Sequence, residues 1–181
     1  TVPSLVEIAD RKLTPELLRP VTLEDLLGRE TIELDKKAIS AYLRGKCVLV
    51  TGAGGSIGSE LCRQAAQENP SRFIIFDNGE YNLYNIDNEL RNLFPDLNII
   101  TVLGDVKNED RVDWVFRKFK PNVVFHAAAY KHVPMVEINP AEGVQNNVTG
   151  TRIIADAANR YDVERFVLVS TDKAVNPANV M

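Results

Sequence analysis

The sequence predicts an α/β protein built on a doubly wound parallel sheet, and three observations lead to this prediction. Short apolar runs rich in β-branched residues alternate with helix-forming stretches along residues 46–181, as expected for strands covered by helices on both faces. The first run, Cys47 to Val50, passes directly into a glycine-rich turn. Polar residues follow the later runs, at the end where parallel strands place their ligands.

The composition is that of a soluble globular protein, with 45% hydrophobic and 25% charged residues among 181. A net charge of −4 argues against a nucleic-acid partner, because phosphate binding needs clustered Lys and Arg side chains. No apolar run approaches the roughly 20 residues that cross a bilayer. We therefore expect a cytoplasmic chain that makes no membrane contact. The two cysteines, Cys47 and Cys62, have no ligand spacing and only two histidines accompany them, so we expect no metal site.

Residues 1–45 differ from the rest because no strand is predicted there. Short helix-forming stretches occupy this segment, and Asp35 is placed to cap a helix over residues 36–43 that Gly45 ends. We predict a helical arm over residues 1–45, which serves as a packing or linker segment. The dinucleotide-binding domain is predicted over residues 46–181.

Three glycines, Gly52, Gly55 and Gly58, lie between the first strand and a helix predicted over residues 59–67. Strand, glycine turn and helix in this order are the context of a dinucleotide site. Glycine permits the tight turn and the close approach of a pyrophosphate, and the helix N-terminus offers free N–H groups to the phosphates. The simpler explanation is a glycine-rich turn between any strand and helix.

Asp77 follows the second predicted strand, residues 72–76, and lies 19 residues beyond Gly58. This is close to the place where the fold puts the carboxylate that accepts the ribose hydroxyls of NAD. A carboxylate would repel the 2′-phosphate of NADP, and no Arg follows directly, so NAD is favoured. Asp77 could instead cap the helix predicted over residues 80–93.

The remaining elements continue the alternation. Small residues after the fourth strand leave room for a flat ligand, and His126, directly after that strand, is interpreted as an interior histidine. Right-handed crossovers then give the strand order 3-2-1-4-5 of a Rossmann fold. The elements are strands over residues 98–103, 122–125 and 165–169 and helices over residues 109–119 and 141–160.

Six motifs together resemble one branch of the extended short-chain dehydrogenase/reductase family, the CapD-type nucleotide-sugar 4,6-dehydratases and epimerases of polysaccharide biosynthesis. The glycine spacing is GxxGxxG, the pattern of the extended type, because Ile57 stands where GxGxxG has its third glycine. The resemblance covers about residues 19–181. The motifs are TGAGGSIGSEL, FDNGEYNLY, GDV, HAAAYKHVPMVE, NNVTGT and VSTDKAVNPANVM.

The resemblance implies where NAD and the nucleotide sugar bind. The glycine turn would hold the pyrophosphate, Asp77 the ribose, and Asp105 and Val106 the adenine, while Asn147 would support the site from its helix. Lys131 and His132 would face the nucleotide sugar, although they could simply cover a turn. The implied cofactor-binding residues are Gly52, Gly55, Ser56, Ile57, Gly58, Asp77, Asp105, Val106, Ala127, Ala128, Ala129 and Asn147.

Thr171, Asp172 and Lys173 match the Thr-Asp-Lys of such dehydratases. The resemblance implies that Lys173 is the base at C5, that Asp172 protonates the leaving C6 hydroxyl, and that Thr171 bonds near O4. Met181 stands where the family has the tyrosine of YxxxK, and methionine cannot exchange a proton. Asp172 and Lys173 could also be a solvated loop pair, and Met181 a core residue.

Three functions therefore stay open. A dehydratase is favoured by Asp172 and Lys173, a 4-epimerase needs only reversible oxidation at C4, and Met181 favours a non-catalytic nucleotide-binding module. We expect the chain to be a fragment that lacks the substrate-binding C-terminal part and is inactive alone. We also expect a homo-oligomer, a parent protein anchored at the cytoplasmic face of the inner membrane, and UDP-N-acetylglucosamine as substrate.

Overall fold

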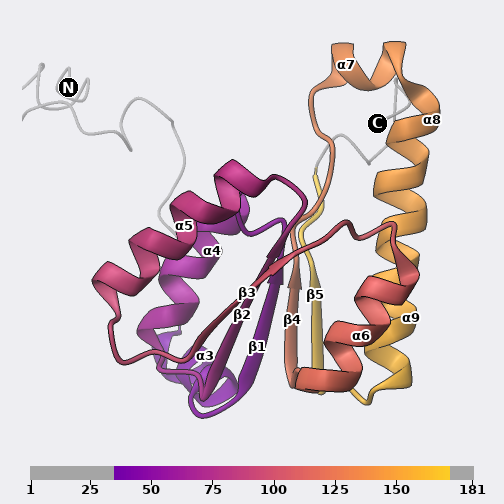
Figure 1. Cartoon of the computed structure of the whole chain (residues 1–181). Helices are drawn as coiled ribbons and strands as arrows, with labels where there is room; N and C mark the ends of the chain where they lie inside the picture. The colour runs from indigo at the N-terminus through magenta and orange to yellow at the C-terminus, as the bar shows by residue number, and fades with distance from the viewer. Residues whose placement is uncertain (1–34, 172–181) are drawn as a thin grey trace, which may run out of the picture. The chain divides into compact units, whose positions relative to one another are not determined.

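The computed structural model of the chain describes residues 35–171 (Figure 1). The chain divides into two compact units, residues 1–36 and residues 37–181, and the described residues belong almost entirely to the second. Most of the predicted arm lies outside the described residues and stays a prediction. Its last helix is present as α3 (Lys36–Leu43), and Gly45 follows with a φ of +71°, the left-handed conformation in which many helices end.

Five parallel strands form one sheet in the order β3-β2-β1-β4-β5 (Figure 1). This confirms the predicted fold class and strand order. Parallel neighbours need crossover connections, which here are helical and place helices on both faces of the sheet. The strands are β1 (Cys47–Thr51), β2 (Arg72–Asp77), β3 (Ile99–Leu103), β4 (Val123–His126) and β5 (Arg165–Leu168).

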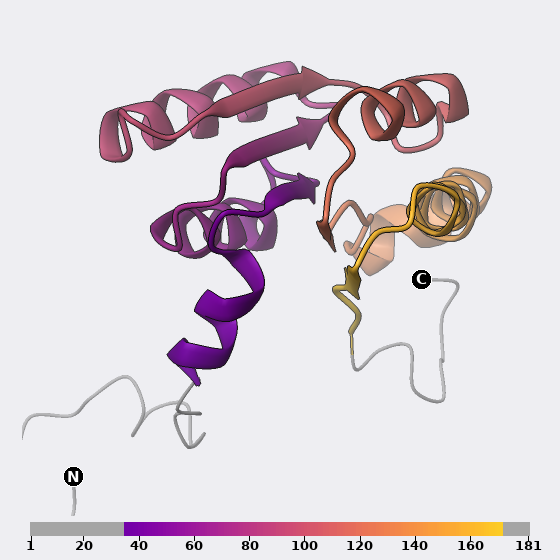
Figure 2. The ribbon, with the colours of Figure 1, turned by 90° about the horizontal axis from the view of Figure 1, so that it is seen from below.

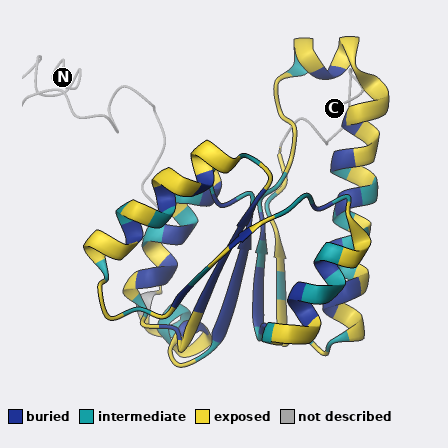
Figure 3. Ribbon diagram, viewed as in Figure 1, coloured by how far each residue is buried: buried dark blue, intermediate teal, exposed yellow. Residues whose placement is uncertain are grey.

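The central strand β1 sends alternate side chains into two separate cores. Val48 and Val50 pack with α3, α4 and α5, whereas Leu49 packs with α6 and α9. Figure 2 shows the two groups of helices on opposite sides of the sheet, and Figure 3 shows the buried strands between them. Burial on both faces explains the continuous apolar runs of β1, β2 and β4, whereas β5, at the edge of the sheet, has three of its four residues exposed. The covering helices are α4 (Ser56–Gln67), α5 (Glu80–Leu93), α6 (Glu109–Phe119) and α9 (Thr151–Arg160).

The segment between β4 and β5 differs from the single helix predicted over residues 141–160. Pro140 starts a separate helix, at a position where its missing N–H costs nothing. A π-helical turn then interrupts the helix, and a Cβ atom at Gly150 would lie 2.7 Å from Val106, so glycine permits close packing there. The elements are α7 (Val133–Ile138), α8 (Pro140–Val144), the π turn η2 (Gln145–Gly150) and α9.

Leu90 and Leu93 lie on the same helix, α5, in contrasting environments. Leu90 is fully buried, whereas Leu93 is 58% exposed. We expect Leu90→Ala to lower the free energy of unfolding by about 2–5 kcal/mol because it leaves a cavity, and Leu93→Ala to lower it by less than about 0.5 kcal/mol. Urea denaturation followed by circular dichroism measures both changes. Equal losses in the two variants would contradict this orientation of α5.

Candidate functional site

A cleft of about 250 Å³ opens at the carboxyl ends of the strands. The turn after β1, the end of β2 and the loops after β3 and β4 form its walls. Seven residues that the sequence assigned to cofactor binding line it: Gly52, Gly55, Asp77, Val106, Ala127, Ala128 and Ala129. Six lining residues were not named from the sequence: Phe76, Asn78, Asn82, Gly104, Tyr130 and Asn146.

The glycine turn is packed so closely that side chains have no room at most of its positions. Gly52 has a φ of +68°, and a Cβ atom there would lie 2.7 Å from the Ala127 carbonyl. At Gly58 a Cβ atom would lie 1.8 Å from the Gly52 carbonyl oxygen, and at Gly54 it would lie 2.6 Å from Asn82 Cβ. Only Gly55 is less crowded, with its nearest neighbour at 3.3 Å. Gly52, Gly54 and Gly58 therefore bring together β1, the loop after β4 and α5.

Helix α4 begins at Ser56, three residues earlier than predicted, and Gly58 lies in its first turn. Its N-cap, Gly55, has an extended backbone and gives no side-chain hydrogen bond to the helix. The first N–H groups of a helix have no partner inside the helix and carry the positive end of its dipole. The cleft therefore has a helix N-terminus beside it that can bind an anion.

The carboxylate of Asp77 is held against the glycine turn. Its Oδ2 accepts a hydrogen bond from Gly54 N at 2.9 Å, and its Oδ1 accepts one from Gly79 N at 2.8 Å. Gly79, not Asp77, is the N-cap of α5, so Asp77 is not the cap considered from the sequence. Each carboxylate oxygen can accept a second hydrogen bond. Asp77 therefore fastens the turn and can still accept ligand hydroxyls.

The π turn fixes the loop after β4. Asn147 Oδ1 accepts a hydrogen bond from Tyr130 N at 2.8 Å, and Asn147 Nδ2 donates one to Tyr130 O at 2.9 Å. The neighbouring Asn146 is buried and donates from Nδ2 to Ala128 O at 3.3 Å. Asn147 itself does not line the cleft, so it acts on the site through the backbone that it holds.

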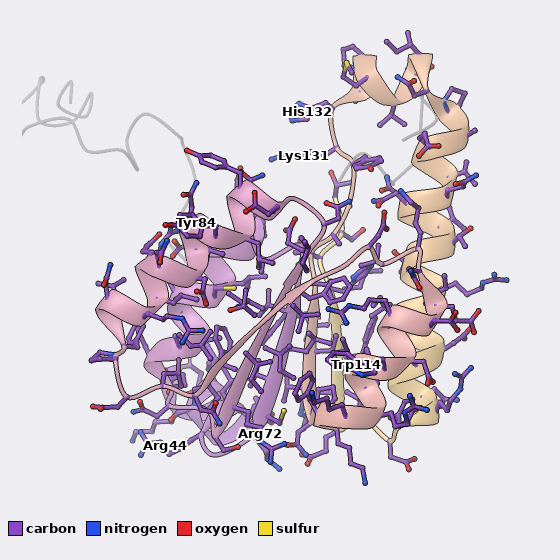
Figure 4. All side chains as sticks on the ribbon, in the orientation of Figure 1. Arg44, Arg72, Tyr84, Trp114, Lys131 and His132 are labelled. Atoms are coloured by element: carbon purple, nitrogen blue, oxygen red, sulfur yellow. The ribbon has the colours of Figure 1, made fainter. Side chains whose placement is uncertain are left out.

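A second cleft of about 450 Å³ adjoins the first and shares Gly55, Ala129 and Tyr130 with it. Lys131 and His132, the residues assigned to the nucleotide sugar, line this cleft from the loop that leads into α7 (Figure 4). Both side chains are exposed. A cation and an imidazole beside an apolar wall suit a ligand that carries phosphate and a ring.

The other assigned residues lie around the two clefts. Ser56 lines the second cleft, and Ile57 is 51% exposed and lines neither. Asp105 lies outside both linings, where its Oδ1 accepts a hydrogen bond from Lys107 N and its Oδ2 lies 3.2 Å from Lys107 Nζ. Thr171 is exposed at the end of the described segment. The assigned catalytic residues Asp172, Lys173 and Met181 lie outside the described residues.

His126 is buried at the end of β4 between two threonines. Its Nδ1 lies 2.6 Å from Thr51 Oγ1 and its Nε2 lies 2.9 Å from Thr151 Oγ1. Burial lowers the pKa of His126 to about 4, because the charged imidazolium loses its hydration. The ring is therefore neutral and joins β1, β4 and α9, in agreement with its interpretation as an interior histidine.

No group of three or more His, Cys, Asp or Glu side chains within residues 35–171 is placed to hold a metal ion. No helix in this range is long and apolar enough to cross a membrane.

The polysaccharide biosynthesis protein family matches residues 48–181. The chain belongs to this family. The match covers the whole sheet except the first residue of β1 and includes both clefts. It confirms the resemblance drawn from the sequence motifs.

Three relatives differ in name and in the share of their length that is matched. The capsular polysaccharide biosynthesis protein CapD of Staphylococcus aureus is 45% identical over 99% of this chain and 30% of its own length. The uncharacterized membrane protein MJ1061 of Methanocaldococcus jannaschii is 42% identical over 79% of this chain and 41% of its own length. A UDP-N-acetylglucosamine 4,6-dehydratase (inverting) of Campylobacter jejuni is 33% identical over 75% and 39%. The chain thus spans less than half the length of these relatives.

Two solved structures share the fold. Pen from Bacillus thuringiensis superimposes with a TM-score of 0.71 at 34% identity, over 77% of this chain and 43% of that protein. WbmG from Bordetella bronchiseptica, in complex with NAD and UDP, superimposes with a TM-score of 0.55 at 28% identity, over 67% of this chain and 36% of that protein.

The lowered pKa of His126 predicts a pH dependence of stability. An unfolded histidine binds its proton near pH 6.5, whereas folded His126 binds it only near pH 4. Stability is therefore complete above pH 6.5 and falls as the pH drops from 6.5 toward 4, by about 3 kcal/mol in total. Urea unfolding between pH 5 and pH 7 measures the slope, in a range where few carboxyl groups titrate.

The two histidines of the chain provide a matched comparison for this test. His126→Asn should flatten the slope between pH 5 and pH 7, although it lowers stability at pH 7. His132 is exposed, so His132→Asn should leave the wild-type slope unchanged. A wild-type protein with no slope in this range would show that His126 is accessible to protons in the folded state.

Proposed function

We propose that this chain is the NAD-binding part of a nucleotide-sugar 4,6-dehydratase, which acts on a UDP-N-acetylglucosamine-type substrate in bacterial surface polysaccharide biosynthesis. The observation that carries the proposal is the first cleft, where the carboxylate of Asp77 is hydrogen-bonded to the glycine turn. The 33% identity to a UDP-N-acetylglucosamine 4,6-dehydratase supports the reaction and the substrate.

The residues of the first cleft fit NAD. The uncapped start of α4 offers N–H donors to a pyrophosphate, and the free lone pairs of Asp77 can accept ribose hydroxyls. The structure of WbmG with NAD and UDP supports the same pair of ligands. A carboxylate at this place repels a 2′-phosphate, so we propose NAD and not NADP as the cofactor.

Residues of the first cleft, among them Gly52 and Asp77, would hold NAD, which when bound would supply the hydride acceptor for oxidation at C4 of the sugar and the hydride donor for reduction at C6. Lys131 and His132 bind the nucleotide sugar in the second cleft. Lys173 takes the proton from C5, which the 4-keto group has acidified, and returns it to C5 when C6 is reduced. Asp172 protonates the hydroxyl that leaves C6 as water, and the proton that oxidation at C4 releases from O4 restores the protonated Asp172. Thr171 donates a hydrogen bond near O4. Met181 has no exchangeable proton and takes no part in proton transfer.

We further propose that the whole protein works as a homo-oligomer and is anchored at the cytoplasmic face of the inner membrane. The membrane protein of Methanocaldococcus jannaschii, 42% identical to this chain, supports the anchoring. The oligomer is proposed from the family resemblance.

NAD binding is predicted to depend on Asp77. Asp77→Ala removes a charged acceptor and should weaken NAD binding about 10-fold to 100-fold, because hydrogen bonds to charged groups contribute about 1.5–3 kcal/mol. Asp96 is exposed before β3, so Asp96→Ala is the control with the same change of charge. Calorimetry with NAD and NADP measures both variants. Equal affinity of the wild type for NADP would overturn the cofactor assignment.

Turnover by the full-length protein tests the reaction. UDP-N-acetylglucosamine should give a 4-keto-6-deoxy product, and Lys173→Gln should slow its formation about 100-fold or more, as loss of a general base does. Lys37→Gln, a change at an exposed site on α3, should leave the rate unchanged. A C4 epimer as product would identify an epimerase. No conversion despite NAD binding would favour the non-catalytic module.

A further inference from the structure

Cations, all exposed except the half-buried Lys46, gather at the amino ends of the strands, the edge opposite the two clefts. We call this surface the amino edge and define it by Arg44, Lys46, Arg72, Lys118, Lys120 and Arg165. In Figure 4, Arg44 and Arg72 lie together below the sheet, while Lys131 and His132 lie at its other end. The chain as a whole has a net charge of −4, so this edge differs in sign from the rest of the molecule.

The strand register places these cations in a row. Arg72 is the first residue of β2 and lies opposite Cys47, the residue after Lys46. Arg165 is the first residue of β5 and lies opposite Val123 of β4. Neighbouring strands are about 4.8 Å apart, so the row from β2 to β5 is roughly 15 Å wide.

Few of these charges are neutralised. Lys46 Nζ donates to both carboxylate oxygens of Glu164, at 2.7 and 2.9 Å. Glu68, Asp96 and Asp162 are the other acids in the turns of this edge. Within the described part of the chain, Arg44, Arg72 and Lys120 form no ion pair, and all three are exposed.

Helix dipoles account for only part of the cluster. Cations are favoured at the C-termini of helices, which explains Lys118 and Lys120 at the end of α6 and Arg44 after α3. Lys46, Arg72 and Arg165 lie before or at the start of strands, where no such dipole acts. Lys46 is paired with Glu164 and Arg165 lies over the Tyr42 ring. Arg72 has neither kind of contact among the described residues, so its position calls for another reason, such as a partner of opposite charge.

Two aromatic rings lie under cations of the same edge. The Arg165 guanidinium lies 4.1 Å from the centre of the Tyr42 ring, and Lys118 Nζ lies 4.6 Å from the centre of the Trp114 ring. Tyr and Trp are enriched where proteins meet the headgroup layer of a bilayer. The combination of cations and partly exposed aromatic rings therefore suits a lipid surface.

We propose that the amino edge docks on the surface of an anionic lipid bilayer, with the clefts facing away from it. A membrane is favoured over nucleic acid because a flat anionic surface attracts only charges within about 10 Å of it. The positive amino edge can therefore lie against the membrane while the acidic remainder of the protein stays beyond the reach of its charge. A polyanion that bends around the protein would also meet the acidic remainder. This proposal revises the expectation of no membrane contact, and it does not depend on the proposed enzymatic function.

Vesicle sedimentation tests the proposal with the present chain. It should bind vesicles of mixed phosphatidylglycerol and phosphatidylcholine, leave pure phosphatidylcholine vesicles unbound, and be released by added salt. A cation near an anionic leaflet contributes roughly fivefold in affinity, so Arg44→Glu/Arg72→Glu should bind at least about 25-fold more weakly. Binding that is absent in the wild type, or unchanged in this variant, would overturn the proposal.

The matched control is Lys37→Glu/Arg152→Glu, which changes the net charge equally. Both residues are exposed at the starts of helices whose other ends reach the amino edge, and we expect less than about a threefold loss. Circular dichroism verifies that each variant folds, and Arg44→Gln/Arg72→Gln replaces the reversal variant if that variant unfolds. Binding of a labelled DNA duplex without binding of anionic vesicles would also overturn the proposal.

Discussion

Backbone packs directly against backbone around the turn that follows β1, and three parts of the molecule meet there. At Gly52, Gly54 and Gly58 an added Cβ atom would lie within 2.7 Å of the loop after β4, of α5 or of the turn itself. Because these side chains are absent, the strand ends come close enough to form one cleft. Asp77 completes the arrangement, since its carboxylate accepts the Gly54 N–H and ties the end of β2 to the same turn. The group that we assign to the ribose is thus also part of the framework that shapes the phosphate site.

Much of the fold could be predicted because strands buried on both faces appear in the sequence as short, continuous apolar runs. The apolar runs gave the sheet order, and the glycine spacing and the position of Asp77 gave part of the first cleft. The family resemblance added Val106 and the three alanines, Ala127, Ala128 and Ala129. Asn82 could not be found in that way, because only the packing of α5 on Gly54 brings it to the cleft. The π turn η2 inside the helix predicted over residues 141–160 was missed because its residues keep the composition of a helix. Four other lining residues were also not predicted, and the only indication of them in the sequence was that they adjoin residues assigned to the site. They are Phe76, Asn78, Tyr130 and Asn146.

The charges of the molecule are distributed by edge. The carboxyl edge has Asp77 at the glycine turn, the pair of Asp105 and Lys107, and the exposed Lys131. The amino edge has Arg44, Arg72 and Lys120 without ion-pair partners among the described residues. A single net charge of −4 hides this cluster of cations at the amino edge, which is why the composition argued against a nucleic-acid partner. The two edges belong to opposite ends of the same strands, so a surface bound at one end leaves ligands free to enter at the other.

The two hydrogen bonds between Asn147 and Tyr130 reproduce the exchange of N–H and C=O that joins neighbouring strands. The side-chain amide of Asn147 here takes the place of a strand residue. Because it pairs with the N–H and C=O of one residue, it fixes which residue of the loop after β4 lies beside the π turn. An insertion or deletion of a single residue in that loop would present a different peptide to Asn147. Since Ala129 and Tyr130 form walls of both clefts, such a change would reshape the two together. Within this family, we therefore expect a change in the length of this loop to be accompanied by a shift of the π turn, and neither change to occur without the other.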